Sequence, residues 1–251
     1  MSPTEPTGAS FWVTLGFIGV TAGAAALGGV VVTLRRRWDA ALLNYFVALG
    51  GGFMLAAAVL EMMPVSASMT SNAPILVLAG YLLIHFVEHT VVRHFHFGEE
   101  THPEHVGVGV GVSALVGLSI HSFFDGISIA SGFVISPRLG LLLFVAIVLH
   151  KAPEGFTIAS IMLAGGYSRA TALISSIAVG AAGILGAVAM YPLAAFVGEG
   201  LAFSAGVTLY VAASDLIPEV NRSGHSRVAV MVFVGVLLYY ATEQCIEMLG
   251  L

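Results

Sequence analysis

The chain is built from long apolar runs that are separated by short polar breaks. Eight such runs can be traced, and each is long enough for the ~20 apolar residues that a bilayer-spanning helix needs. They cover approximately residues 11–34, 42–65, 73–92, 106–133, 139–165, 170–197, 201–220 and 228–249. Because apolar residues are continuous within each run, the pattern predicts helices and not barrel strands. We therefore expect an all-α multi-pass membrane protein with eight transmembrane helices.

The composition supports the same class of protein. Of the 251 residues, 58% are hydrophobic and only 9% are charged, against about a quarter in a soluble domain. The net charge of −5 and the absence of a basic block argue against nucleic-acid binding. The single cysteine, Cys245, can form neither an intrachain disulfide nor a cysteine-based zinc motif. A soluble enzyme is excluded, and the main environment of the chain is the lipid bilayer.

Arginine positions predict the orientation of the helices. If the spans alternate, Arg138 lies alone on one side of the membrane and seven arginines lie on the other. These seven are Arg35, Arg36, Arg37, Arg93, Arg169, Arg222 and Arg227. Because basic residues are enriched on the cytoplasmic side, we expect both termini outside the cytoplasm, in a plasma membrane such as the bacterial inner membrane. Residues 1–251 then form one transmembrane domain, with a flexible tail at 1–8 and a histidine-rich cytoplasmic loop at 94–105.

The fourth and fifth runs share the pattern H-x-x-x-[DE]-G-x-x-I-A-S near their centres. His121 and Asp125 carry it in the fourth run, and His150 and Glu154 carry it in the fifth. Residues four apart lie on one face of a helix, and ionisable groups within a membrane span usually mark a site or a pathway. Two imidazoles and two carboxylates suit zinc and other first-row divalent metals. The alternative is a structural polar network between two helices.

Here the sequence resembles a known family. H-S-x-x-D-G followed by H-K-x-P-E-G resembles the ZIP (Zrt/Irt-like protein) family of divalent-metal transporters, and residues 206–220 resemble that family's seventh helix. The resemblance implies metal movement into the cytoplasm, with the metal bound between helices four and five. It implies the ligands His121, Asp125, His150 and Glu154. Met54 resembles a methionine of the family's second helix near the same site, and simple core packing is its alternative role.

One departure from the family concerns the residue after each histidine. Some members hold two bridged metals and have an acidic or amide residue there, whereas this chain has Ser122 and Lys151. Each lies three residues before a carboxylate, so both can face the carboxylates on the helix surface. An ammonium group would take the place of a second cation. We therefore expect a centre that binds a single metal.

A second internal repeat links the second and seventh runs. Gly, Leu, Ala, an acid and Pro recur at positions 52, 55, 58, 61 and 64, and again at 206, 209, 212, 215 and 218. The two runs would cross the membrane in opposite directions, which is a frequent construction in secondary transporters. Glu61 would then lie toward the outer face, and Asp215 with Glu219 toward the inner face, as stations for a cation. An accidental match is the alternative.

Further donors lie near the ends of other runs. His85 and His89 share a helix face at the end of the third run, with Glu88 between them, and are candidate exit ligands. The histidines of the loop at 94–105 either bind metal weakly or form a solvated polar loop. A last group forms either an entrance or an interfacial rim, and the sequence does not decide between them. Its members are Tyr239, Tyr240, Glu243 and Glu247.

Together these features predict a secondary transporter for zinc or a similar divalent cation, which is its substrate and not a cofactor. No G-x-x-x-x-G-K-[ST] segment is present, so we expect no ATP-driven transport by this chain. The alternative is an intramembrane zinc-dependent hydrolase, in which Lys151 or Ser122 would take catalytic roles. Because H-E-x-x-H is absent, we expect a transporter and not an enzyme. The sequence determines neither the preferred metal nor the oligomeric state, for which a homodimer is one expectation.

Overall fold

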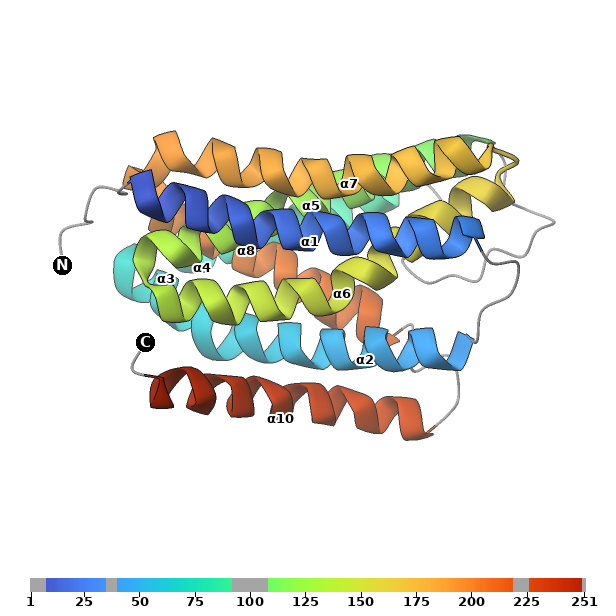
Figure 1. Cartoon of the computed structure of the whole chain (residues 1–251). Helices are drawn as coiled ribbons and strands as arrows, with labels where there is room; N and C mark the ends of the chain where they lie inside the picture. Colours follow the sequence, from blue (N-terminus) through green and yellow to red (C-terminus); the bar gives the residue numbers. More distant parts are fainter. Residues whose placement is uncertain (1–7, 35–39, 92–107, 219–225, 250–251) are drawn as a thin grey trace.

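The computed structural model describes residues 8–34, 40–91, 108–218 and 226–249, which form helices joined by short turns, with no strand among them. The helices lie side by side in one bundle, in line with its long axis (Figure 1). In chain order the elements are α1 (Gly8–Leu34), α2 (Ala40–Ala56), η1 (Ala57–Met62), α3 (Met63–Met69), α4 (Ala73–Phe86), η2 (Val87–Val91), α5 (Val108–Ile135), α6 (Pro137–Ala164), α7 (Arg169–Met190), η3 (Tyr191–Phe196), α8 (Val197–Tyr210), η4 (Val211–Leu216) and α10 (Ser226–Met248). The all-α membrane class is confirmed.

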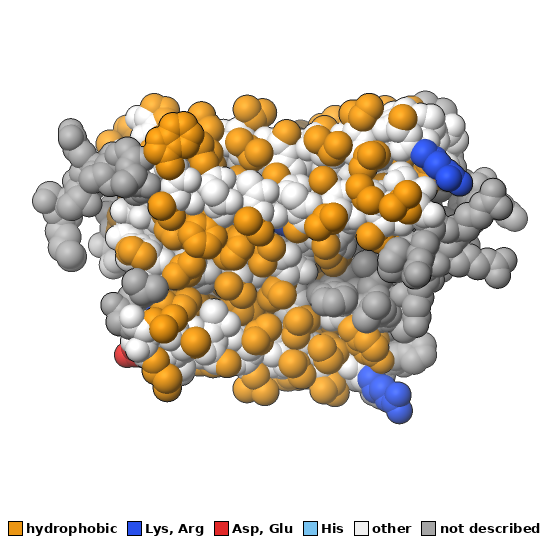
Figure 2. Space-filling model, viewed as in Figure 1, with side chains coloured by type: hydrophobic (Ala, Val, Ile, Leu, Met, Phe, Trp, Pro, Cys, Tyr) orange, Lys and Arg blue, Asp and Glu red, His pale blue; other side chains and the backbone are white. Residues whose placement is uncertain are grey.

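The surface has the polarity of a membrane protein. Hydrophobic side chains cover the middle of the face drawn in Figure 2, and the charged side chains visible there lie at its two ends. Exposed large apolar residues occur on several helices, among them Leu27, Leu82 and Phe233. Such a belt would be unfavourable in water and is satisfied by lipid.

The number of membrane crossings is not settled by helix length alone. Seven helical stretches of the described residues are long and apolar enough to cross a membrane, and one of them, Arg169–Leu216, has 48 residues. At 1.5 Å per residue this stretch would be about 72 Å long, more than twice a hydrocarbon core of ~30 Å. It is broken within η3, where Leu193 has non-helical φ and ψ of −101° and 18°. The count of eight spans stays a prediction.

The path of the chain is consistent with an even number of crossings. α7 and α8 run in opposite directions on either side of the break, and α1 begins at the end of the bundle where α10 finishes (Figure 1). Arg169 and Arg227 lie at the starts of α7 and α10, at the opposite end. Arg138 lies at the start of α6, at the same end as the start of α1. The other arginines of the orientation argument, the loop at 94–105 and Glu219 lie outside the described residues.

The helices pack in two groups. α1, α5, α6 and α7 contact mainly one another, while α10 packs on α2 and α8 packs on α4. The glycines that follow the two site carboxylates make close approach possible in the first group. A Cβ at Gly126 would overlap the backbone carbonyl of Gly183, and one at Gly155 would overlap that of Ala25. Small residues at these crossings therefore bring the helix backbones into direct contact.

Within the described residues, three segments have π-helical hydrogen bonding, and two of them coincide with the repeat found in the sequence. η1 begins one residue before the repeat's Ala58 and ends one residue after Glu61, and η4 stands in the same relation to Ala212 and Asp215. α2 and α8, which lead into them, run in opposite directions (Figure 1). A proline follows each segment by two residues, and its missing N–H and its ring disturb the regular ladder of the preceding turn. π-helical turns are frequent at functional sites.

Candidate metal centre

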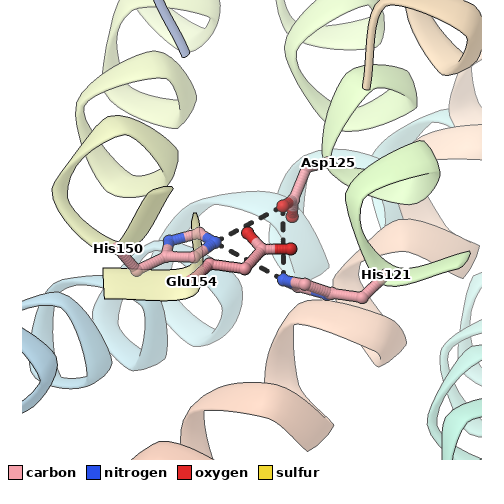
Figure 3. Close-up of side chains that lie close together, drawn as sticks. All are labelled: His121, Asp125, His150 and Glu154. Carbon is pink, nitrogen blue, oxygen red and sulfur yellow. Dashed lines mark hydrogen bonds and ion pairs between the residues drawn. The ribbon is translucent and has the colours of Figure 1, made fainter. Parts of the chain in front are cut away.

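Four donor side chains from α5 and α6 converge inside the bundle (Figure 3). His121 and Asp125 come from α5, and His150 and Glu154 come from α6, each pair one helical turn apart. One ligand atom from each residue lies within 4.8 Å of the others. None of the four residues is more than 4% exposed. The structure thus brings together the four residues that the shared pattern singles out.

The hydrogen bonds of the two imidazoles place the ring protons on different nitrogens. The Nδ1–H of His150 donates to the carbonyl oxygen of Ala146 at 3.1 Å, so its Nε2 carries a lone pair directed into the site. Nε2 of His121 lies 3.2 Å from Oδ2 of Asp125, and its Nδ1 is buried without a partner among the described residues. His121 therefore donates from Nε2 to Asp125. A metal would bind His150 directly but would displace this proton from His121.

Nitrogen and oxygen donors crowd together in a way that favours a cation between them. Nε2 of His150 lies 3.4 Å from Nε2 of His121 and 3.4 Å from Oδ2 of Asp125. Oε1 of Glu154 is buried and has no hydrogen-bond partner within the part of the chain that the structure describes. Buried acceptors without donors are costly, and a bound cation satisfies them. The set can supply the two nitrogens and two oxygens of a tetrahedral zinc shell.

Lys151 occupies the neighbouring position between the carboxylates. Its Nζ lies 2.7 Å from Oδ2 of Asp125 and 2.5 Å from Oε2 of Glu154, and it donates to Oγ of Ser122 at 2.9 Å. Lys151 is 2% exposed and Ser122 is fully buried. The ammonium group therefore lies between the two carboxylates and the hydroxyl of Ser122, and its role in place of a second cation stays a prediction.

Met54 lies on a helix that borders the centre. One turn before it, Gly50 of α2 faces His150, since a Cβ there would lie 3.3 Å from that of His150. Met54 is fully buried within the large hydrophobic core. Its role as a ligand stays a prediction.

Glu61, the acid expected near the outer end, interacts with polar and charged side chains. Glu61 accepts a hydrogen bond from the hydroxyl of Tyr239 at 3.3 Å and interacts electrostatically with both Arg138 and Glu243. The sequence did not indicate these partners. In the sequence, the one signal of a special role for Arg138 is that it is the single arginine on its predicted side of the membrane.

The acid expected near the inner end is also paired. Asp215 lies against Glu88 of η2, which in turn lies against the hydroxyl of Tyr210. The rings of His85, near the end of α4, and His89, in η2, lie against each other with centroids 4.2 Å apart. Residues expected from two separate motifs thus meet at this end of the bundle, although their pairing was not predicted.

Comparisons with known proteins agree with this geometry. A family model described as ZIP zinc transporter matches residues 103–243, which include all four donors. Zinc transporter ZIP9 of Micropogonias undulatus is 30% identical over 166 residues, covering 60% of this chain and 52% of the relative. Zinc transporter ZIP9 of Macaca fascicularis is 33% identical over 126 residues, covering 44% of this chain and 52% of the relative.

A third relative is named as a ZIP13 and not a ZIP9 transporter. The zinc transporter ZIP13 homolog of Drosophila melanogaster is 27% identical over 151 residues, covering 55% of this chain and 41% of the relative. The chain spans about half the length of the curated relatives it matches. All three of these relatives are eukaryotic, so they lend no support to the expected bacterial inner membrane.

Proposed function

Since this chain belongs to the ZIP zinc transporter family, we propose that it carries zinc or a similar divalent cation across the membrane into the cytoplasm as a secondary transporter. The observation that carries the proposal is the group of four buried donors between α5 and α6, whose ligand atoms lie within 4.8 Å of one another. The relatives named as zinc transporters support the choice of cation.

In this proposal His121, Asp125, His150 and Glu154 bind one metal ion, with Met54 as a weaker candidate ligand. The two carboxylates and Lys151 together carry one negative charge when the histidines are neutral. A second divalent ion would meet the ammonium group of Lys151, which lies 2.7 and 2.5 Å from the two carboxylates. Repulsion between a dication and an ammonium ~4 Å apart amounts to several kcal/mol at an effective dielectric constant of about 20. The centre therefore holds a single metal.

The route follows the polar side chains along the bundle. An ion enters past Glu61, loses water and binds at the centre, and then leaves past Asp215 and Glu88. Glu219, His85 and His89 are the further candidates on the exit side. Because binding needs neutral imidazoles and ionised carboxylates, protons compete with the metal for the same donors.

No observation favours the intramembrane hydrolase. The residues that such an enzyme would use as base or nucleophile are Lys151 and Ser122, and these are hydrogen-bonded to each other at 2.9 Å. Lys151 is also in ion pairs with both carboxylates. A catalytic zinc additionally needs an open coordination position for water, whereas four protein donors fill a tetrahedral shell.

The orientation and assembly of the protein are part of the proposal. We assign the end of the bundle that holds Arg169 and Arg227 to the cytoplasm, because basic residues are enriched there. The termini then lie outside. A homodimer and a bacterial inner membrane remain predictions, the first of which is tested by the mass of the purified protein in detergent.

Metal uptake by proteoliposomes tests the function directly. Purified protein should accumulate zinc inside vesicles that contain a zinc-sensitive dye, and protein-free vesicles should not. The variant Glu247→Gln is a matched control, because Glu247 is exposed on α10 and the proposed route assigns it to the interfacial rim and not to the entrance. Vesicles that accumulate none of zinc, iron, manganese, cobalt and cadmium would contradict the proposal.

A further inference from the structure

A second polar cluster lies at the end of the bundle where α6 begins. Nη2 of Arg138, at the start of α6, forms an ion pair with Oε1 of Glu243 on α10 at 2.6 Å. Beside it, the buried Tyr239 of α10 donates to Oε2 of Glu61 on η1 at 3.3 Å. We call these four residues the α6–α10 cluster. Ionisable groups within a membrane bundle are costly, so their presence requires a reason.

The cluster lies on one side of the metal centre. Arg138 precedes His150 on α6 by about three turns, or ~18 Å along the helix. Glu61 follows Gly50 by about the same distance, and Gly50 faces His150. α2 and α6 run in opposite directions (Figure 1). Going back along α6 from His150 and going forward along α2 from Gly50 therefore both lead to the same end of the bundle. The cluster therefore lies between the centre and the proposed outer surface.

The ion pair connects the two groups of helices. α6 carries half of the centre and packs mainly with α1, α5 and α7, whereas α10 packs mainly on α2. Arg138 belongs to the first group, and Glu243 belongs to the second. Any movement that separates the groups at this end must break the ion pair.

The geometry of the pair allows it to break. The guanidinium uses Nη2 on the Glu243 carboxylate, and its buried Nε has no acceptor among the described residues, so the fork is not fully used. The two side chains are 33% and 20% exposed. Partly exposed pairs of this kind contribute about 1 kcal/mol or less. Such a contact stabilises the packing of α6 against α10 only weakly, so it can break at a small cost in free energy.

We propose that the Arg138–Glu243 ion pair is a latch that keeps the outer end of the bundle closed and that opens when α6 separates from α10. Tyr239 holds Glu61 beside the latch, and the cluster keeps one negative charge when Arg138 is paired. That charge attracts a cation to the closed entrance. The inference rests on the proposed transport function for its purpose, but the latch itself can be tested without measuring transport.

The test measures access to a buried cysteine. Ala146→Cys in a Cys245→Ala background places one thiol on α6, between Arg138 and His150, at a residue that is 1% exposed. An impermeant thiol reagent is added from the outer side to protein in sealed vesicles. In Arg138→Gln or Glu243→Gln, labelling should become about fivefold faster, the equivalent of about 1 kcal/mol. The charge-swapped protein, Arg138→Glu with Glu243→Arg, should return to slow labelling.

The matched control is Glu247→Gln, one turn further along α10, which removes the same charge from an exposed position. It should label as slowly as the parent. Unchanged labelling in both single variants, or equal acceleration in the Glu247→Gln control, would overturn the latch. A charge-swapped protein as open as the single variants would also overturn it, since the two charges would then act separately. If labelling follows the expected pattern while zinc uptake is absent, the latch stands and the transport proposal fails.

Discussion

At the scale of single residues, the centre depends on a fixed positive charge beside two carboxylates. Asp125 and Glu154 each contact Lys151 and also lie beside the imidazoles, so the same carboxylates that pair with the ammonium group are the candidate oxygen ligands of the metal. The hydroxyl of Ser122 only orients the ammonium group. Ligands and their supporting residues should therefore respond differently to substitution.

The first prediction compares a ligand with a support. His150→Ala removes a donor whose lone pair is already oriented by Ala146, and it should abolish most zinc uptake while the protein still reaches the membrane. Ser122→Ala removes a neutral hydrogen bond worth about 1 kcal/mol and should retain most uptake. Uptake by proteoliposomes that contain equal amounts of protein is the measurement. Normal uptake by His150→Ala would show that the metal binds elsewhere.

The second prediction concerns stoichiometry. The wild-type centre should bind one zinc, and Lys151→Asp should bind two, because the ammonium is replaced by a further carboxylate. Anomalous scattering at the zinc edge counts the ions, in protein whose histidines at 94–105 have been substituted. Two ions in the wild-type centre would mean that Lys151 does not exclude the second metal.

The third prediction uses thermal unfolding. Lys151→Ala leaves two buried carboxylates without their cation, and loss of one partner from a buried pair typically costs about 3–5 kcal/mol. The metal-free variant should therefore unfold at a lower temperature than wild type. Saturating zinc should recover a large part of the difference, because the metal supplies the missing charge. A variant whose unfolding temperature is unaffected by zinc would contradict this account.

At the scale of the helical elements, close backbone contact positions the centre. Gly126 and Gly155 each follow a site carboxylate, and each meets a backbone carbonyl of the adjacent helix. The contacts that fix the distances from α5 and α6 to their neighbouring helices therefore lie at residues directly next to the two carboxylates. A side chain added at these positions should disturb both packing and metal binding.

The fourth prediction compares two glycines. Gly155→Ala places a methyl group against the carbonyl of Ala25 and should destabilise the protein by about 1–3 kcal/mol, as other overpacked positions do. Gly23→Ala is the matched control, since Gly23 lies within α1 and has open space around it. That change should be neutral, or stabilising by up to about 1 kcal/mol. The unfolding temperature in detergent distinguishes the two, and equal effects would mean that the contact at Gly155 does not constrain the helices.

The helices and the four donors of the centre could be predicted from the sequence, whereas the partners of the flanking acids could not. Continuous apolar runs specify helices, and the i, i+4 spacing places His121 and Asp125 on one face, so these features follow from local pattern. Arg138 and Glu243 lie far apart in the chain, and no period in the sequence encodes which helices become neighbours. The same holds for Glu88 and Asp215. The π-helical turns η1 and η4, each followed by a proline, are not encoded in the apolar pattern of the sequence either.

At the scale of the whole molecule, the orientation of the bundle sets the direction of the proposed transport. Asn72 and Ala170 are both exposed, and they lie at opposite ends of the bundle. Each can carry a single cysteine without the loss of a charge. Their accessibility therefore reports the orientation directly.

The fifth prediction follows from this pair. In a Cys245→Ala background, Asn72→Cys should react with an impermeant thiol reagent in intact cells, and Ala170→Cys should react only after the cells are permeabilised. The reason is that the end with Arg169 and Arg227 is assigned to the cytoplasm. The reverse pattern would invert the topology, and labelling of both in intact cells would contradict the alternation of the spans.

The fixed charge of Lys151 also has an electrical consequence. With neutral histidines, the empty centre carries one negative charge, and binding of a dication makes it one positive charge. In a transport cycle in which the centre itself moves across the membrane field, an inside-negative voltage drives the loaded centre inward and the unloaded centre outward, so it assists both halves of the proposed cycle. Each unit charge that crosses the whole field gains about 2.3 kcal/mol per 100 mV. A neutral residue at this position would leave the empty centre with two negative charges and the loaded centre with none, and voltage would then act on the return step alone.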